Sequence, residues 1–455
     1  MTNEEKQFTI MTQSPVCPLI MKLAIPTIIT MLVTSIYNIA DTYFVSTLGK
    51  SASGAVGVVF SLMAIMQAVS FTLGMGAGNL LSAKLGAKNE DEAQIYGSSS
   101  FYLSLIIGLL ISIFGLVFLT PLMKLLGSTE TVLPYAKVYA TFILIGAPIQ
   151  CGSFVLNNLL RFQGKAIFSM IGISFGSIIN IVLDPIFITK LDMGIKGAGI
   201  ATLIGQIVSF ILLLSVYLCK KTIITLSIKK IGLKPKFYSE IIVVGLPSLC
   251  RQGLASIATI LLNNQAADYG GDAALSAMGI VGKVFMFVFS IAIGIGQGFQ
   301  PVCAYNYSSK NYDRVKTGTI FTYLMMTISM SLIAVFLFIF SDDIIKLFLD
   351  DITVVEIGSY ALKAQAIALP FIGINLICNM AYQSTRKKLA ATFISSCRQG
   401  IFFIPLVFIL PIKLGLKGVE LTQSLADIIT ALISIPFLVT FMYKLNKLEK
   451  DKTLN

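Results

Sequence analysis

The stretch GAGIATLIGQIVSFILLLSVYLC, residues 197–219, carries no charged side chain over 23 positions. As an α-helix it is roughly 35 Å long, which is enough to cross the hydrocarbon core of a bilayer. Strands of alternating polarity, the mark of a membrane β-barrel, do not occur. Working outward from this stretch, we predict an all-α membrane protein with twelve transmembrane helices. The predicted spans are about 18–47, 53–82, 96–120, 134–159, 166–189, 197–219, 239–268, 274–305, 317–341, 356–384, 390–412 and 418–443.

The composition supports this prediction. Of 455 residues, 56% are hydrophobic and only 12% are charged, and the mean hydropathy is +0.85. The charged fraction is about half that of an average soluble domain, so the chain cannot cover a water-exposed surface. This disfavours a disordered chain, a secreted disulfide scaffold and an ordinary cytosolic enzyme.

The residues needed for most enzyme chemistry are missing. The sequence has no histidine, which removes imidazole bases, His-ligated metals and the Ser/His/Asp triad. The seven cysteines are scattered without a CxxC pair, so we interpret them as small apolar residues. The Gly49-Lys50-Ser51 sequence has Phe44 where a phosphate-binding loop needs its first glycine. We therefore expect no enzyme activity, no cofactor and no nucleotide.

The positions of the positive charges predict the topology. Of 34 Lys and Arg residues, 22 fall on the side that holds the N-terminus, nine on the other side and three within spans. By the positive-inside rule, both termini are expected in the cytoplasm of a multi-pass cell-membrane protein. The same bias explains the net charge of +12 without nucleic acid. The N-terminal residues lack a secretory signal, so we expect the first span to be kept, and we expect a monomer.

The two halves of the chain resemble each other at a spacing of about 222 residues. Each half has six spans, so the repeats are parallel, with an axis along the membrane normal, as in many secondary transporters. We predict a bundle at 1–222, a basic cytoplasmic linker at 223–236 and a second bundle at 237–455. The matched positions are Leu23-Ala24-Ile25-Pro26 with Val244-Gly245-Leu246-Pro247, Gly74-Met75-Gly76 with Gly296-Gln297-Gly298, Lys88-Asn89 with Lys310-Asn311, Pro148 with Pro370, Asn157 with Asn379, and Gly194-Ile195-Lys196-Gly197 with Gly415-Leu416-Lys417-Gly418.

Several motifs then resemble those of the multidrug and toxic compound extrusion (MATE) transporters, in particular the bacterial DinF-like and MepA-like branch. The resemblance covers nearly the whole chain. Its motifs are Asn38-Ile39-Ala40-Asp41-Thr42-Tyr43-Phe44-Val45, Asn157-Asn158-Leu159-Leu160-Arg161-Phe162-Gln163-Gly164, Asn180-Ile181-Val182-Leu183-Asp184-Pro185, Gly197-Ala198-Gly199-Ile200-Ala201-Thr202 and Gly298-Phe299-Gln300-Pro301.

The resemblance implies a MATE-type fold and an antiporter that exports bulky amphipathic, often cationic compounds, a route to antibiotic resistance, in exchange for H⁺ or Na⁺. It implies a coupling-cation site at Asp41, Asn180, Asp184 and Thr202. The acids that another branch carries in spans seven and ten are absent here, which argues against a second site of that kind. The coupling ion stays open between H⁺ and Na⁺.

The charges within the spans point to the same two acids. Asp41 and Asp184 lie inside apolar runs, where a charge is costly and usually functional. They precede Lys50 and Lys190 by nine and six residues, so both lie at nearly the same depth. Two carboxylates in one dry pocket do not both stay ionised, so one is expected to bind a proton. The alternative is that Asp184 caps a helix break at Pro185 and Asp41 bonds the local backbone.

The second half repeats Cys-Arg-Gln-Gly, at 250–253 and at 397–400. Arg251 and Arg398 are candidates for the inner cavity, where they would pair with Asp427 or bind an anionic group of a substrate. Alternatively, they snorkel to lipid phosphates or bind free helix carbonyls. Further cavity candidates are Asn157, Met63, Met66, Met286 and Phe287, although most methionines and phenylalanines must be core or lipid-facing.

Two other functions compete with export of small amphipathic compounds. A flippase for a lipid-linked glycan or a phospholipid uses a related fold, and it would need several cavity arginines and lysines for the headgroup. A membrane-embedded enzyme would need a nucleophile with a base, or a metal cluster, and the sequence offers neither.

Overall fold

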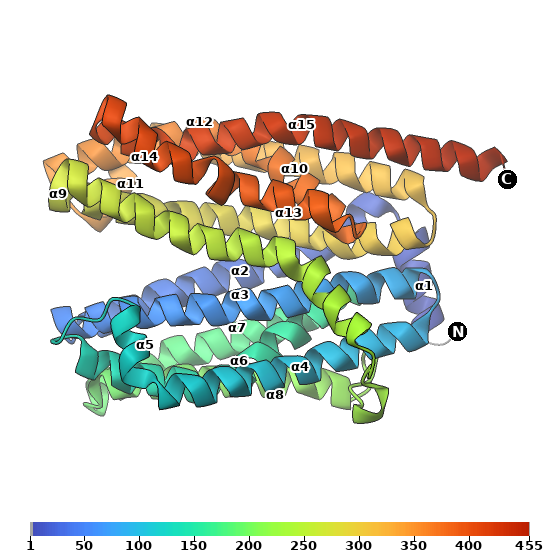
Figure 1. The fold of residues 1–455 in the computed structure, drawn as a ribbon, viewed down its shortest axis with the longest axis horizontal. Coiled ribbons are helices and arrows are strands. Elements are labelled where there is room, and N and C mark those ends of the chain that lie inside the picture. The colour runs from blue at the N-terminus through green and yellow to red at the C-terminus, as the bar shows by residue number, and fades with distance from the viewer. Residues whose placement is uncertain (1–2, 455) are drawn as a thin grey trace. The chain divides into compact units, whose positions relative to one another are not determined.

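The computed structural model describes residues 3–454, and nearly all of them are helical (Figure 1). The part of the chain so described contains no β-strand. The helices of the first half are α1 (Asn3–Gln13), α2 (Val16–Ser46), α3 (Lys50–Gly86), α4 (Glu90–Val117), α5 (Leu119–Leu125), α6 (Leu133–Phe162), α7 (Ala166–Pro185), the π-helix η1 (Ile186–Lys190), α8 (Gly194–Leu218) and the short η2 (Ile228–Lys230). Those of the second half are α9 (Pro235–Ser308), α10 (Tyr312–Ile339), α11 (Ser341–Phe348), α12 (Ile352–Ser384), α13 (Lys388–Ser396), the π-helix η3 (Cys397–Ile401), α14 (Phe403–Leu414) and α15 (Leu416–Leu454).

Within residues 3–454, eleven helical stretches are long and apolar enough to cross a membrane. One of them, α9, is 74 residues long and is broken at Gly271, whose backbone angles (φ 63°, ψ −155°) are not helical. Only glycine adopts such angles without strain. Counted on either side of this break, α9 supplies two spans, so the predicted all-α fold with twelve transmembrane helices is confirmed.

Contacts divide the chain into two compact units. Unit 1 comprises residues up to Gln13 together with Ile25–Leu246, and unit 2 comprises Ser14–Ala24 together with residues from Pro247 onward. In unit 1, α6 packs against α3, α4 and α8, and in unit 2, α12 packs against α10 and α15 (Figure 1). Each unit is therefore built around a long helix that contacts several others.

The unit boundaries lie beside the two matched prolines, Pro26 in α2 and Pro247 in α9. The first turns of α2 pack in unit 2, where Gly298 lies against Ala24, and the first turns of α9 pack in unit 1, where Gly76 lies against Ile241. Gly76 and Gly298 are themselves matched positions. In each half of the sequence, the first helical turns therefore pack against the matched glycine of the other half. The two contact units thus do not coincide with the two halves of the sequence.

The repeat is visible in the turns. Lys88 and Lys310 both adopt left-handed angles (φ 56° and 59°) just before the matched asparagines that are the N-cap residues of α4 and α10. In the same way, Gly194 and Gly415 have φ values of 55° and 61° at the starts of α8 and α15. The sequence matches therefore correspond to the same local backbone geometry in both halves.

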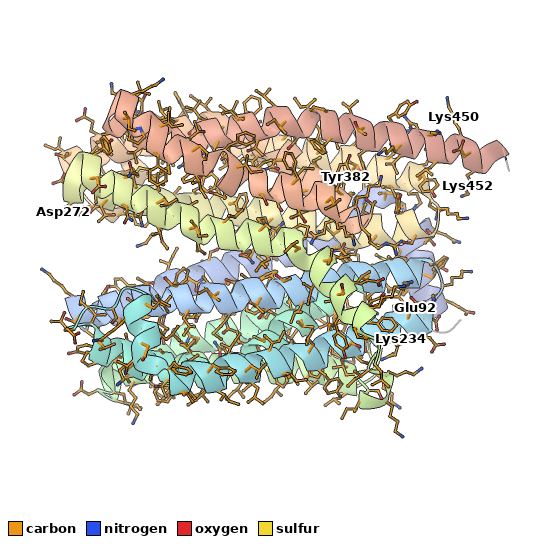
Figure 2. All side chains as sticks on the ribbon, viewed as in Figure 1. Glu92, Lys234, Asp272, Tyr382, Lys450 and Lys452 are labelled. Carbon is orange, nitrogen blue, oxygen red and sulfur yellow. The ribbon has the colours of Figure 1, made fainter. Side chains whose placement is uncertain are left out.

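Large apolar side chains lie exposed along the spans, as expected for helices in lipid. Val117, Leu332 and Val439 are 70%, 68% and 63% exposed. Charged side chains gather at the helix ends: in unit 2, Lys450 and Lys452 lie at one end and Asp272 at the other (Figure 2). Few charged side chains consequently lie in the interior.

Candidate functional site

Unit 1 contains a cavity of about 90 Å³ between α2, α3, α6, α7 and α8. Most of its lining residues are of polar types and none is charged, although the surface that they present to the cavity is mostly apolar. The lining residues are Thr34, Tyr37, Met63, Gln150, Ser153, Phe154, Ile173, Gly176, Ser177, Asn180, Thr202, Gly205, Gln206 and Ser209. The side-chain oxygens of Gln150, Ser153 and Gln206 are buried and have no hydrogen-bond partner within the described residues. Such oxygens can accept hydrogen bonds from a guest that enters the cavity.

Two glycines bring α7 and α8 together beside this cavity. A Cβ on Gly205 would lie 2.7 Å from the carbonyl oxygen of Gly176, so only glycine fits this close approach. The approach places Asn180 of α7 against Thr202 of α8. The Asn180 amide accepts hydrogen bonds from the Thr202 backbone N–H (2.9 Å) and hydroxyl (3.2 Å), and donates to Oδ2 of Asp184 (3.0 Å).

Asp184 is completely buried at the end of α7. The next residue, Pro185, has no N–H for the helical ladder, and the helix continues as the π-helix η1. One carboxylate oxygen, Oδ2, is held by Asn180, whereas Oδ1 has no partner within residues 3–454. Asp184 is thus a buried acid with one oxygen free.

Asp41 of α2 is 6% exposed and has a similar arrangement. The Tyr139 hydroxyl of α6 donates to its Oδ2 (3.1 Å), and its Oδ1 has no partner in the part of the chain described. Asp41 lies close enough to Asp184 for the two charges to interact. The structure therefore brings together the four residues Asp41, Asn180, Asp184 and Thr202, and both carboxylates bind side chains rather than local backbone.

The pair of acids lies behind the cavity wall rather than in it. Neither acid is among the lining residues, whereas Tyr37, Thr202 and Asn180, which binds Asp184, are. The two unpartnered carboxylate oxygens suit a bound proton, and they also suit Na⁺, which prefers oxygen ligands. The described residues contain no cluster of three or more His, Cys, Asp or Glu side chains that would hold a transition metal.

Sequence reasoning missed two tyrosines of this site. Tyr37 lies one helical turn before Asp41, on the same face of α2, and both acids act on it electrostatically. The four-residue spacing could have revealed it. Tyr139, which binds Asp41, is 98 residues away in the sequence, and no local pattern marks it.

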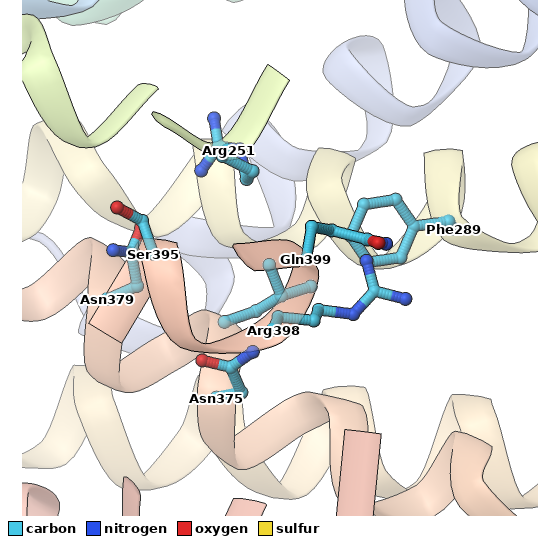
Figure 3. Close-up of a pocket in the computed structure, with 8 residues that line it drawn as sticks. Arg251, Phe289, Asn375, Asn379, Ser395, Arg398 and Gln399 are labelled. Atoms are coloured by element: carbon cyan, nitrogen blue, oxygen red, sulfur yellow. The ribbon is translucent and has the colours of Figure 1, made fainter. Parts of the chain in front are cut away.

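Unit 2 holds a second polar cluster around Arg398, which Figure 3 shows with the nearby Phe289 and Gln399. Arg398 lies in the π-helix η3, and its guanidinium forms two hydrogen bonds with Asp427 of α15, from Nε to Oδ1 (2.6 Å) and from Nη2 to Oδ2 (3.2 Å). Gln423 donates to the same Oδ1 (2.9 Å), and the Phe289 ring lies 4.4 Å from the Arg398 guanidinium carbon. Arg398 thus pairs with Asp427, one of the arrangements that the sequence suggested, whereas Arg251 has no ion-pair partner in residues 3–454.

The other predicted cavity residues have varied surroundings. Met63 lines the unit 1 cavity, whereas Met66 is fully buried in the apolar core. Asn157 is 4% exposed and donates to the backbone oxygen (3.2 Å) and hydroxyl (2.6 Å) of Ser169, which ties α6 to α7. Phe287 is 39% exposed, and Met286 beside it is half-buried.

A helical bundle with many apolar spans, an internal cavity and buried carboxylates is typical of a membrane transporter. Comparison with known proteins identifies the particular family. The MatE family model matches residues 26–186 and 247–409, and the chain belongs to this family. Because its relatives are transporters, the protein is a transporter and not an enzyme.

Curated relatives align over nearly the whole chain. The "Multidrug export protein MepA" of Staphylococcus saprophyticus is 28% identical over 452 residues, which are 99% of this chain and 98% of the relative. The protein of the same name from Staphylococcus haemolyticus is 28% identical over 451 residues, 99% of this chain and 98% of the relative. The resemblance read from the motifs is therefore confirmed.

Solved structures agree with the fold. One, described as an "Outward-facing conformation of a multidrug resistance MATE family transporter of the MOP superfamily", has a TM-score of 0.91 at 25% identity, and the alignment covers 99% of both chains. Another is a MOP superfamily transporter from Pyrococcus furiosus, whose description reports a "reverse polarity of binding pocket". It also has a TM-score of 0.91 at 25% identity and covers 98% of this chain and 99% of its own.

Proposed function

We propose that this protein is a secondary active multidrug antiporter of the cell membrane, with both termini in the cytoplasm. It exports amphipathic, often cationic compounds in exchange for H⁺ or Na⁺, by alternating access. The names of its relatives support the export of multiple drugs. The observation that carries the coupling is the pair of buried acids, Asp41 and Asp184, each with one oxygen unpartnered among the described residues.

The contacts of these acids suggest how an ion acts on the helices. Asp41 joins α2 to α6 through Tyr139, and Asp184 joins α7 to α8 through Asn180 and Thr202. A proton or Na⁺ on the carboxylates changes the strength of these hydrogen bonds, because an ionised acceptor binds more strongly than a neutral one. Since Tyr37, Asn180 and Thr202 also line the cavity, the same event changes the wall that a compound contacts.

Export from proteoliposomes tests this proposal. The vesicles are loaded with the methyl ester of a rhodamine dye, which is a permanent cation, and an inward H⁺ gradient or an inward Na⁺ gradient is imposed. We expect one of the two gradients to drive dye efflux from the wild type and thus to identify the ion. Asp41→Asn and Asp184→Asn should abolish gradient-driven efflux, because an amide cannot exchange a proton and carries no charge for Na⁺.

A matched control is Asp192→Asn, the same change at an exposed loop position. Asp192 has φ 48°, which asparagine also tolerates, so this variant should export normally. Normal gradient-driven efflux by both Asp41→Asn and Asp184→Asn would show that the coupling site lies elsewhere.

A further inference from the structure

Arg251 is a cation inside a membrane span without a counter-ion. It lies on α9, four residues after Pro247, and its Nη1 atom is buried without a hydrogen-bond partner in the described part of the chain. No ion pair of Arg251 occurs within residues 3–454. The side chain as a whole is half-buried, and a guanidinium within a membrane span is costly when no counter-ion compensates for the water that it loses.

The neighbouring Arg398 does not relieve this charge. Its two hydrogen bonds hold both oxygens of Asp427, and Gln423 donates to the same carboxylate. The side chains of Arg398 and Asp427 are only 7% and 1% exposed, so this pair is closed to solvent. Both carboxylate oxygens of Asp427 are therefore already hydrogen-bonded. Together, Arg251, Arg398 and Asp427 carry one net positive charge.

The pocket between the two arginines has the chemistry of an anion site. Arg251 lies on one side, and Arg398 and Gln399 of η3 lie on the other (Figure 3). Asn375, Asn379 and Ser395 complete its polar lining, and its lining residues, all within the described range, include no acid. Asn379 and Gln399 each already donate one amide N–H, to the Ala391 backbone oxygen (2.7 Å) and to the Gln423 side chain (3.4 Å), so each retains one further N–H. The side-chain oxygens of Asn375, Asn379 and Gln399 have no partner in the described residues, so the attraction for an anion comes from the guanidinium charge.

The size of the pocket limits what can enter. Its volume is about 10 Å³, which accommodates one water-sized group rather than a whole drug. A single carboxylate or phosphate oxygen has this size, and the rest of the molecule would remain outside. Guanidinium groups match the two-oxygen geometry of carboxylates and phosphates better than an ammonium does.

We propose that Arg251, with Arg398 fixed beside it by Asp427, forms a site in unit 2 for an oxyanion, either the carboxylate of an exported compound or the phosphate of a lipid. In the first case the inference deepens the proposed function and rests on it, because the transporter would then accept zwitterionic compounds that carry a cation and a carboxylate on one scaffold. Asp427 is a positioning residue in this arrangement, since it holds Arg398 and does not face the pocket.

Two dyes that differ in one group test the site directly. A rhodamine with a free carboxylate and its methyl ester share the same ring cation, and fluorescence polarisation with purified protein measures the binding of each. We expect the acid to bind roughly tenfold more tightly than the ester, as one hydrogen bond to a charged group allows. In Arg251→Gln the acid should bind no more tightly than the ester, while binding of the ester stays unchanged.

Two further variants separate charge from geometry and from folding. Arg251→Lys keeps the charge but loses the planar fork, so it should restore part of the preference for the acid. Lys234→Gln removes one positive charge at an exposed position of the linker and should leave the preference intact. An unchanged ester affinity in Arg251→Gln also shows that this variant is folded.

The lipid source is tested with phosphatidic acid and diacylglycerol, which differ only in the phosphate. If lipid phosphate occupies the site, phosphatidic acid should raise the unfolding temperature of the wild type but not of Arg251→Gln, and it should displace the acid dye. This result would support the oxyanion site and assign it to lipid. If neither the dye preference nor the lipid effect depends on Arg251, the inference is overturned.

The outcome stays separate from that of the proposed function. Gradient-driven export of the ester depends on Asp41 and Asp184 and does not need Arg251. If the wild type does not export the ester but binds the acid more tightly in a manner that depends on Arg251, the antiporter proposal is refuted and the oxyanion site is supported. If the wild type exports the ester normally but shows no such preference for the acid, the oxyanion site is refuted and the antiporter proposal stands.

Discussion

Gly76 gives the sharpest test of how the first turns of α9 pack in unit 1. A Cβ at this position would lie 2.9 Å from the carbonyl carbon of Ile241, closer still to the carbonyl oxygen, and 3.0 Å from the backbone nitrogen of Gly245. Ordinary contacts begin at 3.4 Å, so α3 and α9 would have to separate by at least 0.5 Å. The opposing atoms are backbone and cannot rotate away. Gly76→Ala should therefore lose about 1–3 kcal/mol through overpacking.

A control with the same substitution exists in the same helix. Gly57 of α3 has no atom within 4 Å of its ideal Cβ, so Gly57→Ala should gain only the helix-propensity difference of roughly 0.5–1 kcal/mol. Because both variants gain that difference, the gap between them isolates the packing cost. For a unit of about 200 residues, 1–3 kcal/mol corresponds to roughly 2–12 °C in unfolding temperature.

Thermal unfolding can be followed with a dye that fluoresces on reaction with thiols. Cys151 is buried in unit 1 and becomes reactive when that unit opens, and a Cys219→Ser background removes the exposed thiol of the same unit. Equal unfolding temperatures for Gly76→Ala and Gly57→Ala would refute the close packing of α9 on α3. They would also contradict the assignment of the first turns of α9 to unit 1.

Three further outcomes follow from contacts of single residues. Asp427→Asn leaves Arg398 buried with a weakened partner and should cost roughly 3–5 kcal/mol, whereas the double variant with Arg398→Gln should cost less; thermal unfolding distinguishes them. Gln163 accepts hydrogen bonds from two backbone N–H groups of the linker (2.9 and 3.3 Å), so Gln163→Leu should speed tryptic cleavage between α8 and α9. The nearby Ser359 hydroxyl and a hydrogen bond from Lys363 (3.2 Å) lower the pKa of Asp342 below its ordinary value of 3.8. A lowered folded pKa stabilises the protein above the unfolded pKa, and this contribution is lost as the pH falls through the folded value. Asp342→Asn should therefore lose well under 1 kcal/mol at pH 7 relative to wild type, because the pair is exposed, and this difference should disappear as the pH falls below 3.8 and through the lowered folded pKa.

The spans and the buried acids could be predicted because a lipid environment restricts which residues a membrane-spanning helix can contain. A charge-free run of about 20 residues is rare in a helix that faces water, and an acid within such a run is costly wherever it lies. The depth of Asp41 and Asp184 followed from counting residues along two helices of the same direction. The glycine break of α9 could also be placed, since the predicted spans 239–268 and 274–305 leave Gly271 between them.

The contacts between distant helices could not be predicted in the same way. Tyr139 reaches Asp41 only because α6 packs beside α2, and no local periodicity encodes that choice. The first turns of α2 pack in unit 2 and those of α9 pack in unit 1 because of tight contacts at Gly298 and Gly76. The sequence shows these two glycines only as small residues and does not reveal what they contact. The two π-helices are likewise invisible, because a π-helix adds one residue to a turn without changing its composition.

The repeat explains why the two units differ in charge. Asn157 and Asn379 bind backbone oxygens at residues 169 and 391, so α7 and α13 correspond at a spacing of 222, and Gly194 and Gly415 set a spacing of 221 for α8 and α15. Arg398 then corresponds to residue 176 and Asp427 to residue 206, because 398 − 222 is 176 and 427 − 221 is 206.

These two positions, Gly176 and Gln206, both line the unit 1 cavity of about 90 Å³. In unit 2 the equivalent Arg398 and Asp427 fill the corresponding space with an ion pair, and the pocket that remains has only about 10 Å³. The equivalent helix positions thus line an uncharged cavity in unit 1, whereas in unit 2 they are occupied by an ion pair. Because the Arg398–Asp427 pair is closed to solvent, it leaves Arg251, which has no ion-pair partner within residues 3–454, to bind an anionic group.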